Sequence, residues 1–565
     1  MPGGISASNP PSPESTCRLS VLDEVEAKVP RKTIMSRSRG KLRIHRLISV
    51  LALAWVSRAG ADPVPTFREP WRPQFHFTAP DTWMNDPNGM LFYEGEYHLF
   101  YQNNPFGNRW GHMSWGHAVS RDLTHWEHLP LALAEADGVM IFSGSAVVDW
   151  KNTSGFGQRG KPPLVAIYTG HHTTKPLQQQ HIAYSNDRGR TWTKFTGNPV
   201  LDIGEADFRD PKVFWHEATG RWVMAVSWPQ KRKVRFYASP DLKSWTHLSD
   251  FGPAGSTTGI WECPDLFPVK AEGRGGRSRW VLVVNVGSGA PAGGSGAQYF
   301  VGEFDGTRFV PDTASGVPTK GDALWADFGP DFYAAVSWSD VPKRDGRRLW
   351  IGWMSNWTYA NDVPTLPWRS AMTLPRELAL RETPEGWRLL QVPVRETRGL
   401  RGPGSSLRGA TVPDADAWLG QHRFPAGLAE LELQFDQVPR AGVLTLTCRH
   451  GSIGETRVEA DLGAAVLKVD RTRSGRSDFN PGFAAVHQAP LRLADGRLSL
   501  RLLADVSSLE VFAQGGETVM TGLVLPASPG LTFSLAATEE ARGLRVASVA
   551  LFPLKPSVPP GSPSR

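Results

Sequence analysis

The 565-residue sequence predicts an all-β protein, with a five-bladed β-propeller followed by a β-sandwich. Over residues 66–385, short runs of β-branched and aromatic residues alternate with Gly, Asn and Asp. Trp222–Val226 and Trp280–Val284 are examples. After residue 426 the runs become longer and alternate apolar with polar side chains, as in Leu431–Phe435, which is typical of a sandwich. Helical periodicity is scarce over residues 66–385.

Residues 1–61 have the order of a leader rather than of a folded domain. A basic run from Arg37 to Arg46 precedes the apolar run Leu47–Val56 and then Ala59-Gly60-Ala61. This is the pattern of a secretory signal peptide, here over residues 35–61, and its apolar run is too short to span a membrane. We therefore expect a secreted or periplasmic protein, with translation starting at Met1 or at Met35. The Pro/Ser-rich tail 556–565 is predicted to be disordered.

Charge and cysteine usage exclude several functions. The net charge is +7, but residues 1–61 hold ten Lys or Arg against four Asp or Glu, so the rest of the chain is nearly neutral. Nothing therefore indicates a nucleic-acid partner. Cys17 lies in the leader, and Cys263 and Cys448 are far apart, which makes no disulfide framework and no zinc-ligand spacing.

Two repeated elements predict the blades. The first is a Ser/Asp turn that ends in tryptophan, found at Ser120–Trp126, Ser185–Trp192 and Ser239–Trp245. The second places an acid and a proline before an apolar strand, at Arg209–Phe214, Cys263–Phe267 and Gly329–Tyr333. Repeats of this length, each holding several strands, are typical of propellers. Strand-opening elements near residues 86, 143, 210, 265 and 331 give five blades, and we expect their acids to converge at one mouth of the central channel.

The domain boundaries follow from changes in these patterns. We expect the propeller, as the catalytic domain, over residues 66–385 and the sandwich over residues 426–555. Residues 386–425, which include the run Arg401–Ser406 of Gly, Pro and Ser, are expected to be a connector.

Three acids stand in motifs that suit glycoside chemistry. Asp86 lies in the turn Trp83–Gly89, Asp210 follows Arg209, and Glu262 lies in Trp261–Pro264. Hydrolysis of a glycosidic bond with retention needs two carboxyl groups about 5–5.5 Å apart, and a third can stabilise the transition state. Taken singly, each acid is better explained by a structural role: a turn for Asp86, an ion pair with Arg209 or a turn cap for Asp210, and a solvated loop for Glu262.

The order of motifs resembles glycoside hydrolase family 32, which contains levanases, exo-inulinases and invertases. A sandwich segment, Asp505–Phe512, also resembles the family, although Val506 stands where an arginine is usual. The co-linear motifs are Trp83–Gly89, Gln102, Trp110–His112, Phe142–Ser145, Arg209–Pro211, Trp261–Asp265, Ser355–Asn361 and Pro364–Thr365.

The resemblance implies a role for each matched residue. Asp86 is expected to be the nucleophile and Glu262 the general acid/base, with Asp210 as the transition-state stabiliser. No metal or organic cofactor is implied. His171 and His172 are expected to be surface or packing residues. The residues expected to line the substrate pocket are Asn85, Gln102, Trp110, Phe142, Ser143, Arg209 and Trp357.

The predicted function is a secreted retaining β-fructosidase that hydrolyses terminal β-D-fructofuranosyl units of levan or inulin, and sucrose. Two other enzymes use the same intermediate, a sucrose-preferring invertase and a fructosyltransferase. A glycan-binding propeller without catalysis is the alternative from another class. The sequence leaves open the preferred substrate, exo or endo cleavage and the oligomeric state, and it indicates only a structural role for the sandwich.

Overall fold

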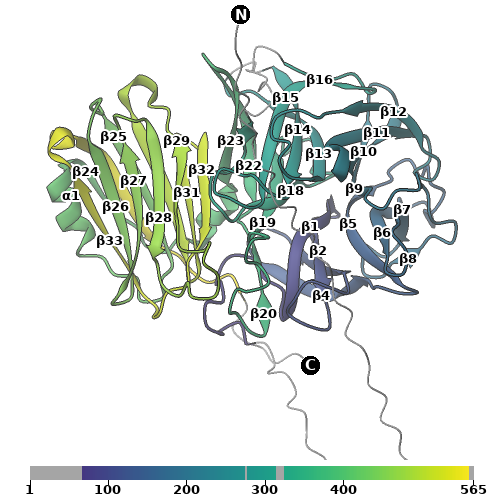
Figure 1. Cartoon of the computed structure of the whole chain (residues 1–565), viewed down its shortest axis with the longest axis horizontal. Coiled ribbons are helices and arrows are strands. Elements are labelled where there is room, and N and C mark those ends of the chain that lie inside the picture. Colours follow the sequence, from purple (N-terminus) through teal and green to yellow (C-terminus); the bar gives the residue numbers. More distant parts are fainter. Residues whose placement is uncertain (1–65, 274–276, 313–322, 559–565) are drawn as a thin grey trace, which may run out of the picture. The chain divides into compact units, whose positions relative to one another are not determined.

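The computed structural model describes residues 66–273, 277–312 and 323–558, so the predicted leader and most of the predicted tail lie outside the described residues. Within that part, nearly all regular structure is β-strand (Figure 1). Strands β1–β23 form five small sheets, and β24–β34 form two larger ones. This confirms the predicted fold class.

The five small sheets are the propeller blades. The first holds β1 (Thr82–Tyr93), β2 (Glu96–Asn104), β3 (Ser114–Ser120) and β4 (Trp126–Leu133), with β20 (Trp368–Arg369) beside β1. The second holds β5 (Val139–Val148), β6 (Leu164–His172), β7 (Gln178–Ser185) and β8 (Thr193–Lys194). The third holds β9 (Arg209–His216), β10 (Arg221–Trp228), β11 (Lys233–Ser239) and β12 (Thr246–Phe251), with the short helix η1 (Pro229–Lys231) before β11.

The last two blades each carry an added strand. The fourth holds β13 (Trp261–Lys270), β14 (Ser278–Val286), β15 (Gly296–Phe304) and β16 (Phe309–Pro311), and β17 (Leu324–Trp325) also pairs with β15. The fifth holds β18 (Tyr333–Ser337), β19 (Arg348–Met354), β22 (Arg376–Thr383) and β23 (Gly386–Pro393), and β21 (Ala371–Met372) pairs with β19.

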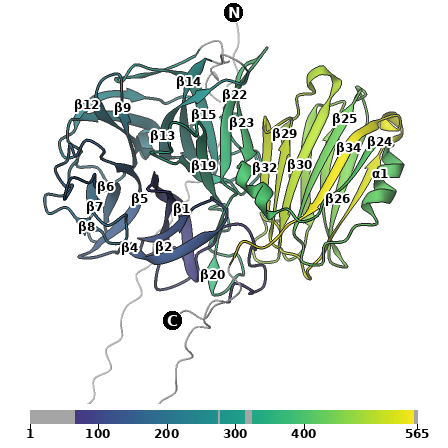
Figure 2. The same cartoon turned by 180° about the vertical axis from the view of Figure 1, so that it is seen from behind.

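The first strand of every blade lies at the centre. These strands are β1, β5, β9, β13 and β18 (Figures 1 and 2); each contacts the next, and β18 contacts β1, which closes the ring. Apolar side chains fill the space between blades, as where Ile167 of the second packs with Val213 and Met224 of the third. Fully burying such a side chain is worth about 1.5–3 kcal/mol. The inner strands therefore form a fixed frame for whatever lies at their ends.

The Ser/Asp turns join the third and fourth strands of the first three blades. In the first blade, Oδ1 of Asp122 accepts hydrogen bonds from the backbone N–H groups of Thr124 at 2.9 Å and His125 at 2.8 Å. Asp241 makes the equivalent pair in the third blade, and Asp187 accepts from the backbone of Thr191 in the second. The repeat thus marks a turn in which an aspartate satisfies backbone donors that no strand can reach.

Residues 386–425 differ from the expected single connector. β23 (Gly386–Pro393) pairs with β22 along its whole length, and its Trp387 and Leu389 pack against the fourth blade. β24 (Ser405–Thr411) pairs with β34, and α1 (Val412–Leu419) follows it with a capping box at Thr411. The Gly- and Pro-rich run separates two elements that are not connector. The residues before it pack on the fourth blade, and those after it pair with β34. Within residues 386–425, only η3 (Arg395–Leu400) and a few residues after it form the covalent link between propeller and sandwich.

The sandwich packs two antiparallel sheets over one core. One sheet has the order β24, β34 (Arg545–Pro553), β25 (Ala429–Asp436), β30 (Leu498–Asp505), β31 (Ser508–Ala513) and β32 (Thr518–Leu523). The other has the order β29 (Val486–Pro490), β28 (Val466–Arg473), β27 (Gly454–Asp461), β26 (Val443–His450) and β33 (Leu531–Ala537). The short helices η4 (Ala494–Gly496) and η5 (Glu539–Ala541) lie between strands. Leu431, Leu433 and Phe435 alternate into the core, as their sequence pattern predicts.

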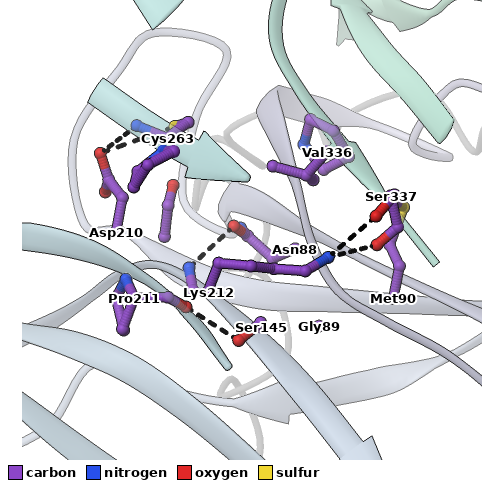
Figure 3. A pocket seen from close by; sticks show the side chains of 14 residues that line it. Asn88, Gly89, Met90, Ser145, Asp210, Pro211, Lys212, Cys263, Val336 and Ser337 are labelled. Atoms are coloured by element: carbon purple, nitrogen blue, oxygen red, sulfur yellow. Dashed lines mark hydrogen bonds between the residues drawn. The ribbon is translucent and has the colours of Figure 1, made fainter. Parts of the chain in front are cut away.

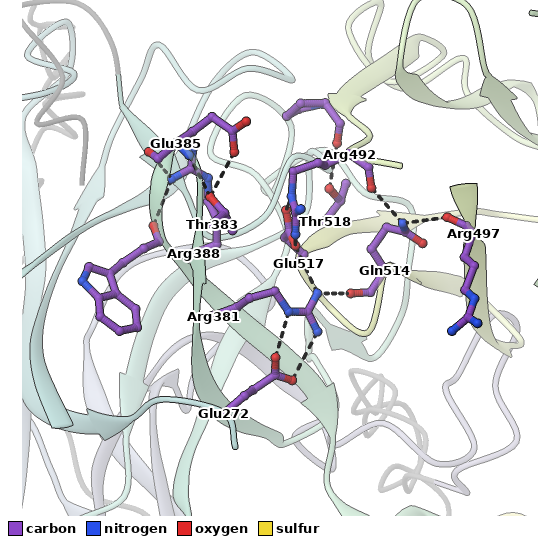
Figure 4. Close-up of polar contacts among 12 residues, drawn as sticks. Glu272, Arg381, Thr383, Glu385, Arg388, Arg492, Arg497, Gln514, Glu517 and Thr518 are labelled. Atoms are coloured by element: carbon purple, nitrogen blue, oxygen red, sulfur yellow. Dashed lines mark hydrogen bonds and ion pairs between the residues drawn. The ribbon is translucent and has the colours of Figure 1, made fainter. Parts of the chain in front are cut away.

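Ion pairs join the sandwich to the propeller. Buried His76, just before the first blade, lies 2.8 Å from carboxylate oxygens of both Asp505 and Glu510. Nη2 of Arg376, in the fifth blade, donates to the other oxygen of Glu510 at 2.6 Å. A second, more exposed group is centred on Arg381, which binds Glu272 and Glu517 (Figure 4).

Candidate active site

All five inner strands are irregular at the end where the predicted site residues lie. The register shifts between Met84 and Pro87 in β1, and β9 carries an extra residue between Arg209 and Lys212. The other shifts bracket Phe142–Ser143 in β5, Cys263–Pro264 in β13 and Ala334–Ala335 in β18. Such bulges bend a strand and turn a side chain out of its ordinary alternation. They aim the polar residues of the inner strands at one mouth of the propeller.

Positive backbone angles mark the same places. Asp210 has φ +66°, Cys263 has φ +43° and Ala334 has φ +51°. Residues with a side chain adopt this left-handed region rarely, and they persist there only when the surrounding structure holds them. Here the surrounding blades do so, and the result is a cluster of acids from three strands.

Cys263 links the three predicted catalytic acids. Its backbone N–H donates to Oδ2 of Asp210 at 2.9 Å, and its thiol lies 3.5 Å from Oδ2 of Asp86 and 3.6 Å from Oδ2 of Asp210. Glu262 precedes it in the chain. The structure therefore brings Asp86, Asp210 and Glu262 together from β1, β9 and β13.

Asp86 is buried and oriented by two hydrogen bonds. The hydroxyl of Ser143 donates to Oδ2 at 2.6 Å, and the side-chain amide of Asn85 donates to Oδ1 at 2.8 Å. Nε1 of Trp83 in turn donates to Oδ1 of Asn85 at 2.7 Å. Burial raises the pKa of Asp86, the two hydrogen bonds oppose that rise, and nearby Glu262 adds to it. The carboxylate is thus fixed in position, and no cation pairs with it in the part of the chain that the structure describes.

Glu262 is held on both of its oxygens. Oε1 accepts from Nε and Nη2 of Arg209 at 3.1 and 3.0 Å, and Oε2 accepts a hydrogen bond from the hydroxyl of Tyr333. Nη1 of Arg209 also binds Asp207 at 2.8 Å and Gln178 at 3.1 Å, so the guanidinium is itself anchored. This pair of donors would stabilise the carboxylate that remains after Glu262 gives up a proton.

Burial and the crowding of acids raise the pKa of Asp210. Burial raises its pKa to about 7; Arg209 lowers the pKa, while the negative charges of Glu262 and Asp86 raise it further. Three acids and one arginine share a small volume, so at neutral pH the cluster lies close to a protonation change. A cluster of acids with shifted pKa values in a cleft is characteristic of sites that transfer protons.

The remaining predicted residues surround these acids in different ways. Trp357 stacks on Trp83 with ring centroids 6.0 Å apart, and Trp110 meets Phe142 edge to face at the same distance. The indole of Trp110 is 42% exposed, so its surface is available to a ligand. Gln102 is buried and donates to the carbonyl of Ile141 at 2.9 Å. Its amide nitrogen is therefore already used to join the first two blades.

The channel below the acids is closed. Lys212 extends across it, and its Nζ donates to the carbonyl of Ser337 at 2.5 Å (Figure 3). The same Nζ lies 3.1 Å from Oδ2 of Asp265. The cavity beside Asp210, Cys263 and Lys212 measures only about 10 Å³. Any substrate must therefore reach the acids from the mouth and not through the propeller.

Two of the expected converging acids lie elsewhere. Asp265 points to Lys212 in the channel, and Asp331 accepts from Tyr359 and Arg471, so it ties the fifth blade to the sandwich. The acid-and-proline element therefore marks the start of an inner strand without fixing where its acid points. Glu262 and Asp265 lie on either side of the one-residue bulge in β13, and their side chains have different partners.

Two residues at the site have no role predicted from the sequence. Tyr333 occurs there only in a repeated element, and Cys263 occurs in a repeated element and in the motif Trp261–Asp265, yet both lie beside the acids. His171, expected at the surface or in packing, stacks on Phe142 with centroids 4.4 Å apart and an interplanar angle of 8°. The strand-opening repeat was the available signal for Tyr333, since it occupies the same strand end as the acids.

In residues 66–273, 277–312 and 323–558 there is no cluster of three or more His, Cys, Asp or Glu side chains that could hold a metal ion. The same residues contain no helix that is long and apolar enough to cross a membrane.

Buried acids at one mouth of a five-bladed propeller suit the hydrolysis of a glycosidic bond, the chemistry of a glycoside hydrolase. The model of the Glycosyl hydrolases family 32 N-terminal domain matches residues 76–393, and that of the Glycosyl hydrolases family 32 C terminal matches residues 396–551. The chain belongs to glycoside hydrolase family 32, as the motifs in the sequence indicated. The first model ends at Pro393, the last residue of β23.

Known relatives agree with this assignment. A levanase of Bacillus subtilis is 48% identical over 529 residues, which cover 91% of this chain and 75% of the levanase. An extracellular exo-inulinase of Aspergillus ficuum is 39% identical over 525 residues, covering 88% of this chain and 96% of the inulinase. The crystal structure of exo-inulinase from Aspergillus awamori superimposes with a TM-score of 0.80 at 37% identity, covering 87% of this chain and 99% of that chain.

Proposed function

We propose that this protein is a secreted retaining β-fructosidase that releases terminal β-D-fructofuranosyl units from levan or inulin and also cleaves sucrose. The proposal rests on one observation: the site contains two acids whose side chains have different kinds of partner. Asp86 is fixed by Ser143 and Asn85 without a cation, whereas Glu262 is held by Arg209 and Tyr333. Family membership and the levanase and exo-inulinase relatives support the choice of a fructosyl substrate.

In the first step, Asp86 attacks the anomeric carbon of the fructofuranosyl unit while Glu262 donates a proton to the leaving oxygen. The bond to the leaving group breaks, and a covalent fructosyl-enzyme forms on Asp86. In the second step, Glu262 takes a proton from water, which attacks the same carbon and frees Asp86. Arg209 and Tyr333 stabilise the Glu262 carboxylate between the two steps.

Asp210 is proposed to bind ring hydroxyls that gain positive character in the transition state. Its pKa of about 7 lets the carboxyl accept or donate a hydrogen bond near neutral pH. Ser143, Asn85 and Arg209 are proposed to bind the remaining polar edge of the sugar. Trp110, Phe142 and Trp357 are proposed to form the apolar wall, and Gln102 to support it from behind.

The domain roles are part of the same proposal. Residues 66–385, extended by β23, form the catalytic propeller, and the sandwich has a structural role. Residues 35–61 are proposed to direct secretion, which suits a substrate too large to import. The extracellular exo-inulinase relative supports this location.

Product analysis tests the proposal. The protein from Asp62 onward is incubated separately with levan, inulin and sucrose, beside the Asp86→Asn variant. We expect free fructose to accumulate steadily from a polymer, without intermediate oligosaccharides. A ladder of oligosaccharides would mean endo cleavage, and release from sucrose alone would mean an invertase. Folded protein with no activity on any of the three would overturn the enzyme assignment in favour of a binding propeller.

A further inference from the structure

A large cavity lies at the end of the propeller opposite to the acids. Its volume is about 1040 Å³, and it is formed by the ends of β5, β9 and β13 together with the segment after β18. β9 shows the separation, because Asp210 is its second residue and Trp215 and His216 are its last two. At about 3.3 Å per residue, the two places are on the order of 15–20 Å apart. A cavity of this size can take several sugar units.

This cavity and the active site are separate compartments. Lys212 and Ser337 line both the far cavity and the narrow channel below the acids. The Lys212 ammonium binds the Ser337 carbonyl and lies 3.1 Å from Asp265, which closes the channel between them. A ligand in the far cavity therefore cannot reach Asp86 through the propeller.

The cavity offers fixed tryptophan surfaces. Trp150 is 61% exposed, and its Nε1 donates to Asp340 at 2.8 Å, which sets the orientation of the ring. Nε1 of Trp215 donates to Glu217 at 3.1 Å, and its ring packs edge to face on Trp222. Flat indoles whose orientation is already set provide a broad apolar face at low entropic cost. The C–H face of a sugar ring packs well on such a surface.

The polar lining carries both signs of charge. Lys151 lies over the ring of Trp215 at 4.3 Å, and Lys343 pairs with Glu217 at 3.4 Å. Arg348 does not use all of its hydrogen-bond donors. Its buried Nε has no hydrogen-bond partner among the described residues, and Nη1 reaches the carbonyl of Trp338 only at 3.4 Å. Glu217 and Asp340 supply acceptors.

This mixture selects against a highly charged ligand. A polyanion would meet the acids, and a polycation would meet the lysines and Arg348. A neutral polyhydroxylated chain suits both, since each hydroxyl can donate to a carboxylate and accept from a cation. We propose that the cavity is a second carbohydrate-binding site that holds a segment of the fructan polymer, a proposal that rests on the proposed function.

The consequence is a difference between polymer and small substrates. Binding a distant segment, or a neighbouring chain of the same particle, keeps chain ends at high local concentration near the acids. Sucrose is too small to gain from this. The site should therefore lower KM for levan or inulin and leave the kinetics on sucrose unchanged.

The kinetic test compares Trp150→Ala with Ile453→Ala, which removes an even more exposed apolar side chain from the sandwich. Both variants are made in the full chain, and thermal unfolding checks their fold. We expect Trp150→Ala to raise KM for levan or inulin by about three- to tenfold, with sucrose kinetics unchanged. We expect Ile453→Ala to match the wild type. Equal KM for the polymer in Trp150→Ala and the wild type would count against the second site.

A binding test decides independently of turnover. Migration of Asp86→Asn through a levan-containing native gel is measured with excess fructose to occupy the active site. We expect retardation that is lost in Asp86→Asn/Trp150→Ala. Equal retardation of both proteins, or none for either, would overturn the second site. A wild type that is inactive on every substrate would overturn the proposed function instead, so the two failures are distinguishable.

Discussion

Two clusters of buried acids in this molecule have opposite electrostatics. At the propeller–sandwich interface, Glu510 is paired with Arg376 and His76, and these partners hold its pKa at about 2 despite burial. At the propeller mouth, Asp210 is as deeply buried, but it shares one arginine with two other acids and has a pKa of about 7. Burial alone therefore does not distinguish a structural acid from a reactive one. The balance of neighbouring charges does.

The difference indicates what each cluster contributes. A buried acid with its own cations stabilises one arrangement of two domains, and removing a partner leaves an uncompensated charge. Acids in excess over cations cost stability, and the protein retains them where chemistry needs carboxyl groups near a protonation change. The predictions below test this contrast, from the largest expected effect to the smallest.

The nucleophile gives the largest expected effect. Asp86→Asn should lower turnover of levan and sucrose by at least about 10⁴-fold, because an amide cannot form the covalent intermediate. The thermal unfolding midpoint should not fall, because Asp86 has no cationic partner to leave unpaired. Steady-state kinetics and a thermal melt measure both. Turnover near that of the wild type would remove Asp86 from the mechanism.

The interface should show the reverse pattern. Arg376→Met leaves Glu510 and Asp327 buried without their arginine and should lower the free energy of unfolding by about 3–5 kcal/mol. Turnover per folded molecule should change little.

Arg381→Met is the matched control for this variant, since Arg381 pairs with two acids at a partly exposed position. It should cost at most about 1 kcal/mol. Denaturant titration followed by tryptophan fluorescence compares the two variants. Equal losses for both would show that burial of the pair does not matter.

The two clusters should also differ in pH dependence. The carboxylates of Asp505 and Glu510 raise the pKa of His76 to about 9 despite burial, so its stabilisation is complete below pH 6.5 and is lost as pH rises through 9. The pKa of Asp210 is higher in the folded state, so protonation of this carboxyl stabilises the fold. That stabilisation is lost at lower pH than the stabilisation from His76, between about pH 4 and 7.

Thermal melts from pH 4 to 10 separate these contributions. His76→Gln should flatten the decline between pH 6.5 and 9, and Asp210→Asn should flatten the decline between pH 4 and 7. A variant that changes the other window would contradict the assignment of the two clusters.

Some features of the fold and of the site can be predicted from the sequence, and others cannot. The Ser120–Trp126 turn and its copies identified the blades because the aspartate and tryptophan act within a few residues of each other. Motif order located Asp86, Asp210 and Glu262. The bulges at Asp210 and Cys263 could not be predicted, because each depends on pairing with a neighbouring strand. For the same reason the sequence predicts a connector over residues 386–393, whose pairing partners lie in β22.

The smallest expected effect concerns a residue that was found only in the structure. Tyr333→Phe removes the hydroxyl that donates to Oε2 of Glu262 and should lower kcat by about tenfold, because one hydrogen bond to a charged group is lost. The pH profile of kcat should shift at the same time. A change in KM alone, with an unaltered profile, would indicate that Tyr333 only shapes the pocket.

The central claim is that Asp86 and Glu262 act in two displacements through a covalent intermediate, and the configuration of a transfer product tests it most directly. Wild-type protein is incubated with sucrose and methanol, and NMR identifies the first methyl fructofuranoside formed. Two displacements at one carbon predict the β anomer, because methanol replaces water in the second step. The α anomer as first product would contradict a nucleophilic Asp86 and indicate direct displacement instead.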